Sequence, residues 1–193
     1  MLRRYRLALG LWICGVVMLF VALISASIVR RGIPAYENAS GAYSTQGESL
    51  PLPIPLLILD SCTLIVGCFA LGLARRRSAA ASLQREVSNK PFWWIYSAIV
   101  LSLAFLAGQA MAWRVMQAQG MFISTNSRVS FFYLLIGAHA LQIAIGLLAL
   151  IWVVARSANW TAMGRYIAVD LATWYFSAMT ALWLVLFCFL VFA

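Results

Sequence analysis

The sequence predicts an all-α, polytopic membrane protein: a bundle of five transmembrane helices in a single membrane domain covering residues 1–193. Two observations predict it. Hydrophobic residues make up 64% of the chain and charged residues only 10%, which lies outside the range of soluble globular domains. Charged residues also divide the chain into five mostly apolar segments, each long enough for the roughly 20 residues that a membrane-spanning helix needs. The predicted helices cover about residues 7–29, 52–74, 92–114, 130–155 and 167–192.

The first segment, Leu7 to Val29, contains no charged residue. It follows three arginines, as a secretory signal would, but it is longer than the usual apolar region of a signal peptide. Arg30 and Arg31 follow it without a small-residue cleavage pattern. We therefore expect a helix that is retained.

The other four segments carry their own boundary signals. The second contains Asp60 and ends at three consecutive arginines, Arg75 to Arg77. Pro91 suits the first turn of the third helix, which is uncharged and has aromatic residues at both ends, as interfacial belts do. The fourth is uncharged, and the fifth is interrupted by one acid, Asp170.

The connectors differ in length. Residues 30–51 form the longest, rich in glycine and polar residues, and are predicted to be an outside loop. Residues 75–90 form an inside connector. The last two connectors are short, which predicts antiparallel neighbouring helices.

The net charge of +9 reflects membrane topology, because the basic residues lie at helix ends and in connectors instead of on one soluble face that could bind nucleic acid. An N-terminus inside and a C-terminus outside place ten of the 14 basic residues inside, as the positive-inside rule requires. The inside residues are Arg3, Arg4, Arg6, Arg75, Arg76, Arg77, Arg85, Lys90, Arg156 and Arg165. The outside residues are Arg30, Arg31, Arg114 and Arg128.

Ionisable groups inside a membrane span cost about 2.5–3.5 kcal/mol at a helix centre and are candidate functional residues. For Asp60, a structural and a functional role are equally open. We expect Asp170 to be an interfacial acid near Arg165.

His139 and Gln142 are three residues apart, so both lie on one helix face and can hydrogen-bond the same neighbour. Haem held by two histidines would need a second histidine, and a soft copper site would need a histidine, cysteine and methionine cluster. We therefore expect His139 to make a hydrogen bond between helices. Gln109 and Trp113 are four residues apart. A buried Gln109 would join two helices through its side-chain amide.

The methionines and cysteines show no metal-ligand spacing. Met111, Met116 and Met121 are expected to fill the core or an interface. The four cysteines all lie within apolar segments, and we expect them to be buried small apolar residues. They are Cys14, Cys62, Cys68 and Cys188.

Several motifs together resemble subunit III of the haem-copper oxidases, in the five-helix form that lacks the first two helices of the seven-helix version. The likeness covers nearly the whole chain. The helix entry at residues 52–57 with Asp60-Ser61 looks like the family's Leu-Pro entry with its Asn-Thr pair, and residues 130–147 are similar to its aromatic, Gly-x-His-x-x-His, Gly-Leu signature. The final helix resembles the family's through Asp170, Tyr175 and the stretch from Met179 to Trp183 and Leu184. Gln109, Trp113 and Gly120 match the family's glutamine, tryptophan and glycine.

The sequence also departs from that family at intramembrane polar positions. Val16 and Ala112 stand where the family has glutamates, and Gln142 replaces the second histidine of the signature. Residues 176–178 replace a Trp-His-Phe stretch with Phe-Ser-Ala, and Thr180 replaces an aspartate. No proton-uptake role is carried over to these positions.

The resemblance implies a multi-pass subunit of the inner (cytoplasmic) membrane that is not an enzyme by itself. Its partners would be the catalytic subunit I and other oxidase subunits, together with membrane lipid. It would pack on and stabilise the catalytic subunit of a proton-translocating cytochrome c oxidase in aerobic respiration. Haem and copper would reside in that partner, and phospholipid would bind in a cleft between helix groups.

No catalytic, cofactor-binding or metal-ligating residue is predicted in the chain itself. The candidates for structural, lipid or partner contacts are Asp60, Gln109, Trp113, His139, Gln142, Asp170 and Trp183. The close alternatives are subunit III of a quinol oxidase and an accessory subunit of a nitric oxide reductase. Two other classes stay open: a small transporter with a polar site around Asp60, His139 and Gln142, and a membrane scaffold of another assembly.

Overall fold

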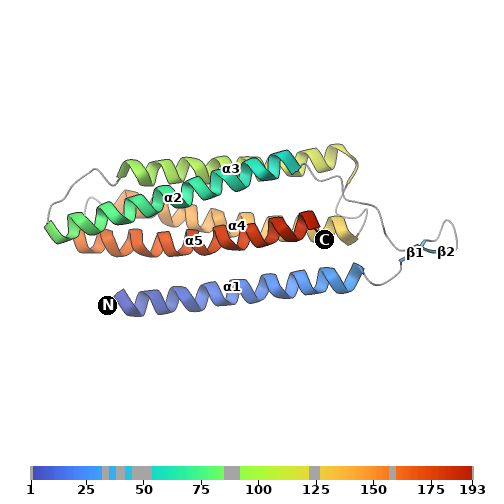
Figure 1. Cartoon of the computed structure of the whole chain (residues 1–193), viewed down its shortest axis with the longest axis horizontal. Coiled ribbons are helices and arrows are strands. Elements are labelled where there is room, and N and C mark those ends of the chain that lie inside the picture. The colour runs from blue at the N-terminus through green and yellow to red at the C-terminus, as the bar shows by residue number, and fades with distance from the viewer. Residues whose placement is uncertain are drawn as a thin grey trace.

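The computed structural model describes residues 2–31, 35–37, 42–44, 54–84, 92–121, 127–156 and 160–192. Five long helices dominate them (Figure 1). The elements in chain order are α1 (Leu2–Arg31), β1 (Ala35–Glu37), β2 (Ala42–Ser44), α2 (Ile54–Gln84), α3 (Phe92–Ala118), α4 (Ser127–Arg156) and α5 (Ala162–Phe192). All five helices are long and apolar enough to cross a membrane, which confirms the predicted helical membrane fold for the described part of the chain.

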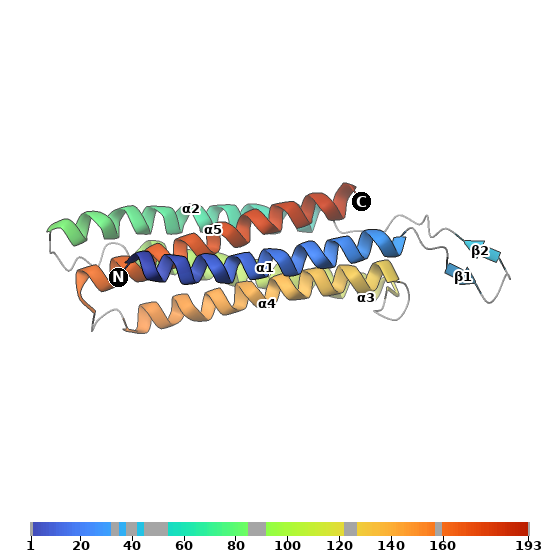
Figure 2. The same ribbon diagram turned by 90° about the horizontal axis from the view of Figure 1, so that it is seen from below.

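The helices lie side by side along the long axis of the molecule (Figures 1 and 2). Helix α2 packs against α3 and α5, and α4 packs against the same two helices. Among the described residues, helix α1 packs mainly against α4 and α5, and less extensively than the other helices pack against one another. We call the end where α1 and α5 begin the N-terminal end of the bundle, and the end where α5 finishes the C-terminal end.

The helices extend beyond the apolar segments of the sequence. Helix α2, for example, continues through Arg75 to Arg77 and ends at Gln84. At about 1.5 Å per residue, the apolar part of each helix is enough to cross the hydrocarbon layer. The additional charged turns can then lie among the headgroups and keep their backbone hydrogen bonds.

The long first connector contains a short antiparallel hairpin that the sequence analysis treated as loop. Strand β1 pairs with β2 so that Tyr36 lies opposite Tyr43. Three-residue strands carry too little alternation to be recognised among the surrounding glycine and polar residues.

Helix α3 ends in a Schellman motif. Gly120 has φ of 75°, the left-handed conformation that glycine adopts without a Cβ clash. The Met121 amide donates to the carbonyl of Met116 at 3.1 Å, and the Gly120 amide donates to that of Gln117 at 3.0 Å. The Tyr133 hydroxyl then donates to the Met121 carbonyl at 2.9 Å, which fixes the turn against α4.

The core contains aromatic side chains from every described helix except α2, which contributes leucines. The largest side chains with almost no exposure include Trp183, Phe20, Phe105, Phe132, Leu57 and Leu71. Many other large apolar side chains are exposed on all sides, as expected where the outer solvent is lipid.

The expectation that the cysteines are buried is wrong for three of them. Cys14, Cys62 and Cys188 are exposed, and Cys68 is partly exposed. Burial of a small apolar residue brings little advantage when the exterior is itself apolar, so an apolar segment does not indicate which of its faces points inward.

Candidate functional site

Five buried polar or aromatic residues from four helices form one cluster, which we call the polar layer. They are Asp60 and Ser61 of α2, Gln109 of α3, His139 of α4 and Trp183 of α5. Four of the seven residues singled out from the sequence are therefore brought together. The polar layer lies in the half of the bundle nearer the C-terminal end.

Asp60 and Gln109 join α2 to α3. The Gln109 Nε2 atom donates to Asp60 Oδ2 at 2.8 Å, and each residue is 2% exposed. The predicted role of Gln109 in joining two helices is therefore seen directly. Gly108 makes room for the carboxyl group, because a Cβ atom at that position would overlap the Asp60 side chain.

Trp183 joins α5 to α2. Its Nε1 atom donates to Ser61 Oγ at 2.9 Å, and that hydroxyl in turn donates to the Leu57 carbonyl at 2.8 Å. The indole is fully buried, so its N–H group needs a partner inside the protein. The Ser61 oxygen is that partner, and the Ser61 hydroxyl proton is itself used in the hydrogen bond to the Leu57 carbonyl.

The expected hydrogen bond of His139 is absent among the described residues. Its ring is fully buried and neither nitrogen has a partner. Instead, the imidazole stacks on Trp183 with ring centres 5.2 Å apart, and Phe20 and Phe105 meet it edge-on. Aromatic packing from α1, α3 and α5 thus surrounds this histidine, so it acts as a flat ring and not as a hydrogen-bonding group.

Replacing Trp183 with phenylalanine is expected to lower the free energy of unfolding by about 1 kcal/mol, because the hydrogen bond to Ser61 is lost while most of the stacking on His139 is kept. Unfolding in mixed micelles would measure it. Ser61→Ala is expected to have a similar effect, and the double variant should cost little more than either single one. Fully additive losses would mean that the two residues do not act through their shared hydrogen bond.

Gln142 and Trp113 lie outside the polar layer. The Gln142 carbonyl accepts a hydrogen bond from the Tyr175 hydroxyl at 2.8 Å, while its side-chain Oε1 has no partner among the described residues. The indole of Trp113 packs on Gly137 and meets Tyr133 edge-on at 5.5 Å. His139 and Gln142 therefore do not hydrogen-bond the same neighbour among the described residues.

Asp170 forms a second site, at the N-terminal end of the bundle. Its carboxyl group is fully buried between two arginines from other helices. Arg6 Nε of α1 lies 2.8 Å from Oδ2, and Arg75 Nε of α2 lies 2.6 Å from Oδ1. We call these three residues the arginine clamp.

Asp170 was expected to be an interfacial acid near Arg165, and the structure shows ion pairs with Arg6 and Arg75, which that expectation did not include. Arg165 is five residues away on the same helix, outside the three- and four-residue spacings at which helix side chains are neighbours. From the sequence, Arg6 and Arg75 were predicted only to lie on the inside of the membrane. Their interaction with one acid could have been suspected from the scarcity of acids, since only two lie within the predicted spans.

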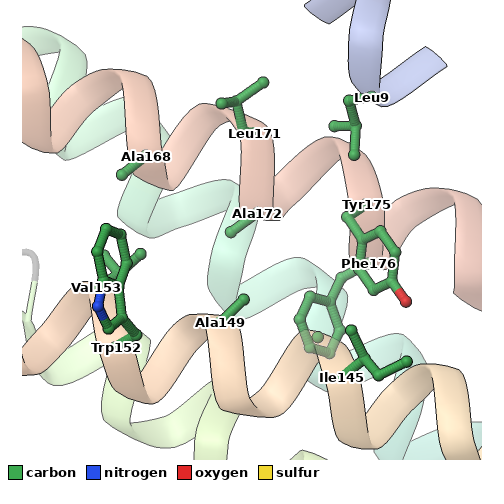
Figure 3. A pocket seen from close by; sticks show the side chains of 11 residues that line it. Leu9, Ile145, Ala149, Trp152, Val153, Ala168, Leu171, Ala172, Tyr175 and Phe176 are labelled. Atoms are coloured by element: carbon green, nitrogen blue, oxygen red, sulfur yellow. The ribbon is translucent and has the colours of Figure 1, made fainter. Parts of the chain in front are cut away.

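An apolar groove of about 270 Å³ lies between α1, α4 and α5. Figure 3 shows Ala149 of α4 facing Ala172 of α5 across it, with Leu9 pointing toward it from α1. Gly146, Tyr175 and Trp152 also line it. The small residues keep the two helix backbones close and leave the groove open beside α1.

The positions that depart from the oxidase subunit pattern are mostly buried. Val16 and Ala112 lie in the core at 7% and 0% exposure. Thr180 donates to the carbonyl of Phe176 in its own helix at 2.8 Å, and the Ser177 hydroxyl lies 3.3 Å from the sulfur of Cys68. Apolar side chains or hydroxyl groups with a partner thus occupy most of these positions, and Gln142, whose Oε1 has no partner among the described residues, is the exception.

No group of three or more histidine, cysteine, aspartate or glutamate side chains that could hold a metal occurs among the described residues. The side-chain hydrogen bonds between Gln109 and Asp60 and between Trp183 and Ser61, and the ion pairs of the arginine clamp, join helices. The fold and these two sites define a polytopic α-helical membrane protein.

No family model matches the chain. Comparison with individual known proteins does find relatives. The chain is 26% identical over 186 residues to a protein of Mycobacterium bovis named probable cytochrome c oxidase subunit 3, covering 91% of this chain and 81% of the relative. The protein of the same name from Mycobacterium tuberculosis gives the same figures. A third, from Nocardia farcinica, is 25% identical over 150 residues, covering 76% of this chain and 66% of the relative. The chain therefore has distant homologues with that name over most of its length.

Proposed function

We propose that this chain is the membrane-embedded subunit III of a haem-copper terminal oxidase of the cytochrome c oxidase type. In this role it packs against the catalytic subunit in the inner (cytoplasmic) membrane and stabilises it. The observation that carries the proposal is the similarity to proteins named cytochrome c oxidase subunit 3, which extends over 91% of the chain and therefore over most of its five helices.

The way the buried polar groups are used supports a non-catalytic role. Asp170 is neutralised by two arginines, and Trp183 and Gln109 hydrogen-bond across helix interfaces. Such contacts hold the helices in register. The exposed apolar surface of the bundle is available to cover a membrane-embedded partner, which would hold the haem and copper.

The apolar groove suits one acyl chain of a phospholipid, which we propose as its occupant. Its lining is formed by aliphatic and aromatic side chains, and it lies within the span of α4 and α5. Leu9 is one helical turn from Arg6, so the groove approaches the basic N-terminal end of the bundle.

Affinity purification from native membranes tests the proposal. A tagged chain extracted in a mild detergent is expected to bring down a haem-copper catalytic subunit, identified by mass spectrometry and by its haem absorption spectrum. The control is a tagged, unrelated membrane protein of similar abundance. Recovery of a different assembly without haem would favour a scaffold, and substrate uptake by the chain alone in liposomes would favour a transporter. Either result would contradict the proposal.

We also propose that the N-terminus is inside and the C-terminus outside, because of the arginines at the N-terminal end of the bundle. An alkaline phosphatase fused after residue 193 is expected to be active, since the enzyme folds only outside the cytoplasm. The same reporter inserted between α2 and α3 is expected to be inactive. The opposite pair of results would reverse the orientation.

A further inference from the structure

The two buried aspartates of this chain have very different surroundings. Asp170 lies between two arginines, which supply compensating positive charge. Asp60 is equally shielded from solvent, but among the described residues it has no ion-pair partner. Within the described part of the chain, its side chain accepts one hydrogen bond, from the neutral amide of Gln109.

The other groups that the structure describes around Asp60 do not supply charge. Helix α3 presents Gly108 and Gln109 to it. The neighbouring Ser61 is bound to Trp183 of α5, whose indole stacks on His139 of α4. His139 is the other titratable group of the polar layer, and it is enclosed by aromatic rings instead of facing a carboxylate.

The Gln109 amide has an unused acceptor next to this carboxyl group. Its Nε2 donates to Asp60, but its buried Oε1 has no partner among the described residues. A carboxylate can only accept hydrogen bonds, whereas a carboxylic acid also has one O–H to donate. An isolated carboxylate is strongly disfavoured when it is buried away from water, even after relaxation of the protein, and a neutral acid avoids that cost.

We propose that Asp60 and Gln109 form a proton-binding site between α2 and α3, in which Asp60 is held as a carboxylic acid. The carboxylate takes one proton from a hydronium ion of the aqueous phase: an O–H bond forms at Asp60, and one O–H bond of the hydronium ion breaks to leave water. The O–H group of the acid can then donate to Gln109 Oε1 while the carboxyl group accepts from Nε2. Both the oxygen and the nitrogen of the Gln109 amide are then hydrogen-bonded. Asp170 differs from Asp60 in geometry, because the two guanidinium groups of the arginine clamp lie against its carboxyl oxygens. This inference does not depend on the proposed oxidase role.

Infrared spectroscopy of the full chain in phospholipid bilayers at neutral pH tests the proposal. Asp60 and Asp170 are the only aspartates in the sequence, so ¹³C labelling of aspartate carboxyl groups separates their bands from those of the three glutamates. The wild-type chain is expected to show one label-sensitive carboxylic acid C=O band, which shifts when H₂O is exchanged for D₂O. Asp60→Asn, which keeps the size and hydrogen-bonding capacity of the side chain, should remove this band.

Two further variants sharpen the result. Gln109→Leu should move the band to higher frequency, because the acid loses its hydrogen bonds. Asp170→Asn is the matched control and should leave the band in place while removing a carboxylate band. Absence of the band from the labelled wild-type chain would overturn the proposal without any variant having to fold, and so would its loss in Asp170→Asn.

Discussion

Replacing Asp170 with asparagine is expected to loosen α1 from the bundle and to lower the free energy of unfolding by about 3 kcal/mol. That is the lower end of the range for removing one member of a buried ion pair. The lower end applies because the Arg6 and Arg75 side chains are 38% and 37% exposed, so water or lipid headgroups partly solvate them once their partner is lost.

The effect should be concentrated in α1, because that helix has few other contacts with the bundle. Within it, Val16, Phe20 and Ser27 are the described residues that are buried. Helix α2 keeps its packing against α3 and α5 when Arg75 loses its partner. The arginine clamp therefore contributes a larger share of the attachment of α1 than of α2.

Two measurements check this expectation. Unfolding in mixed micelles gives the change in stability, and a cysteine introduced at Phe20 reports on α1, since it should react with a membrane-permeable maleimide faster when Asp170 is replaced. Arg76→Gln is the control, because Arg76 is exposed beside Arg75 and takes no part in the clamp. Equal stability and equal labelling in Asp170→Asn and Arg76→Gln would show that the clamp does not hold α1.

The five helices were predictable because a membrane makes segment composition decisive. Charged residues bound each apolar segment, and no other secondary structure can satisfy its backbone groups there without forming a closed barrel. Gln109 was predictable as a joining residue for a related reason: a buried amide in an apolar segment needs a partner on a neighbouring helix.

The arginine clamp was not predictable in the same way. Arg6 and Asp170 are 164 residues apart, and helical periodicity shows which residues share a face but not which helix that face meets. The aromatic surroundings of His139 were missed for a similar reason. Phe20, Phe105 and Trp183 come from three other helices, and only the packed bundle brings them around one ring.

Replacing Gly146 with alanine is expected to lower the free energy of unfolding by about 2 kcal/mol, within the usual range for overpacking a core. A Cβ atom at this position would lie 2.6 Å from Tyr175 Cε1 and 3.1 Å from Phe176 Cε2. The Tyr175 ring is not free to move away, because its hydroxyl group is bound to the Gln142 carbonyl on the same helix as Gly146. Helices α4 and α5 would therefore have to separate.

Gly72→Ala provides the matched control, since a Cβ atom there meets nothing within 4 Å. It is expected to be neutral or to stabilise slightly, because alanine favours a helix over glycine by up to about 1 kcal/mol. Combining Gly146→Ala with Tyr175→Leu should recover part of the lost stability, because the smaller side chain leaves room for the added methyl group. A Gly146→Ala variant as stable as Gly72→Ala would show that the α4–α5 interface tolerates expansion. If Tyr175→Leu does not recover stability, the loss of stability in Gly146→Ala would have to come from the contact with Phe176 and not from the contact with the Tyr175 ring.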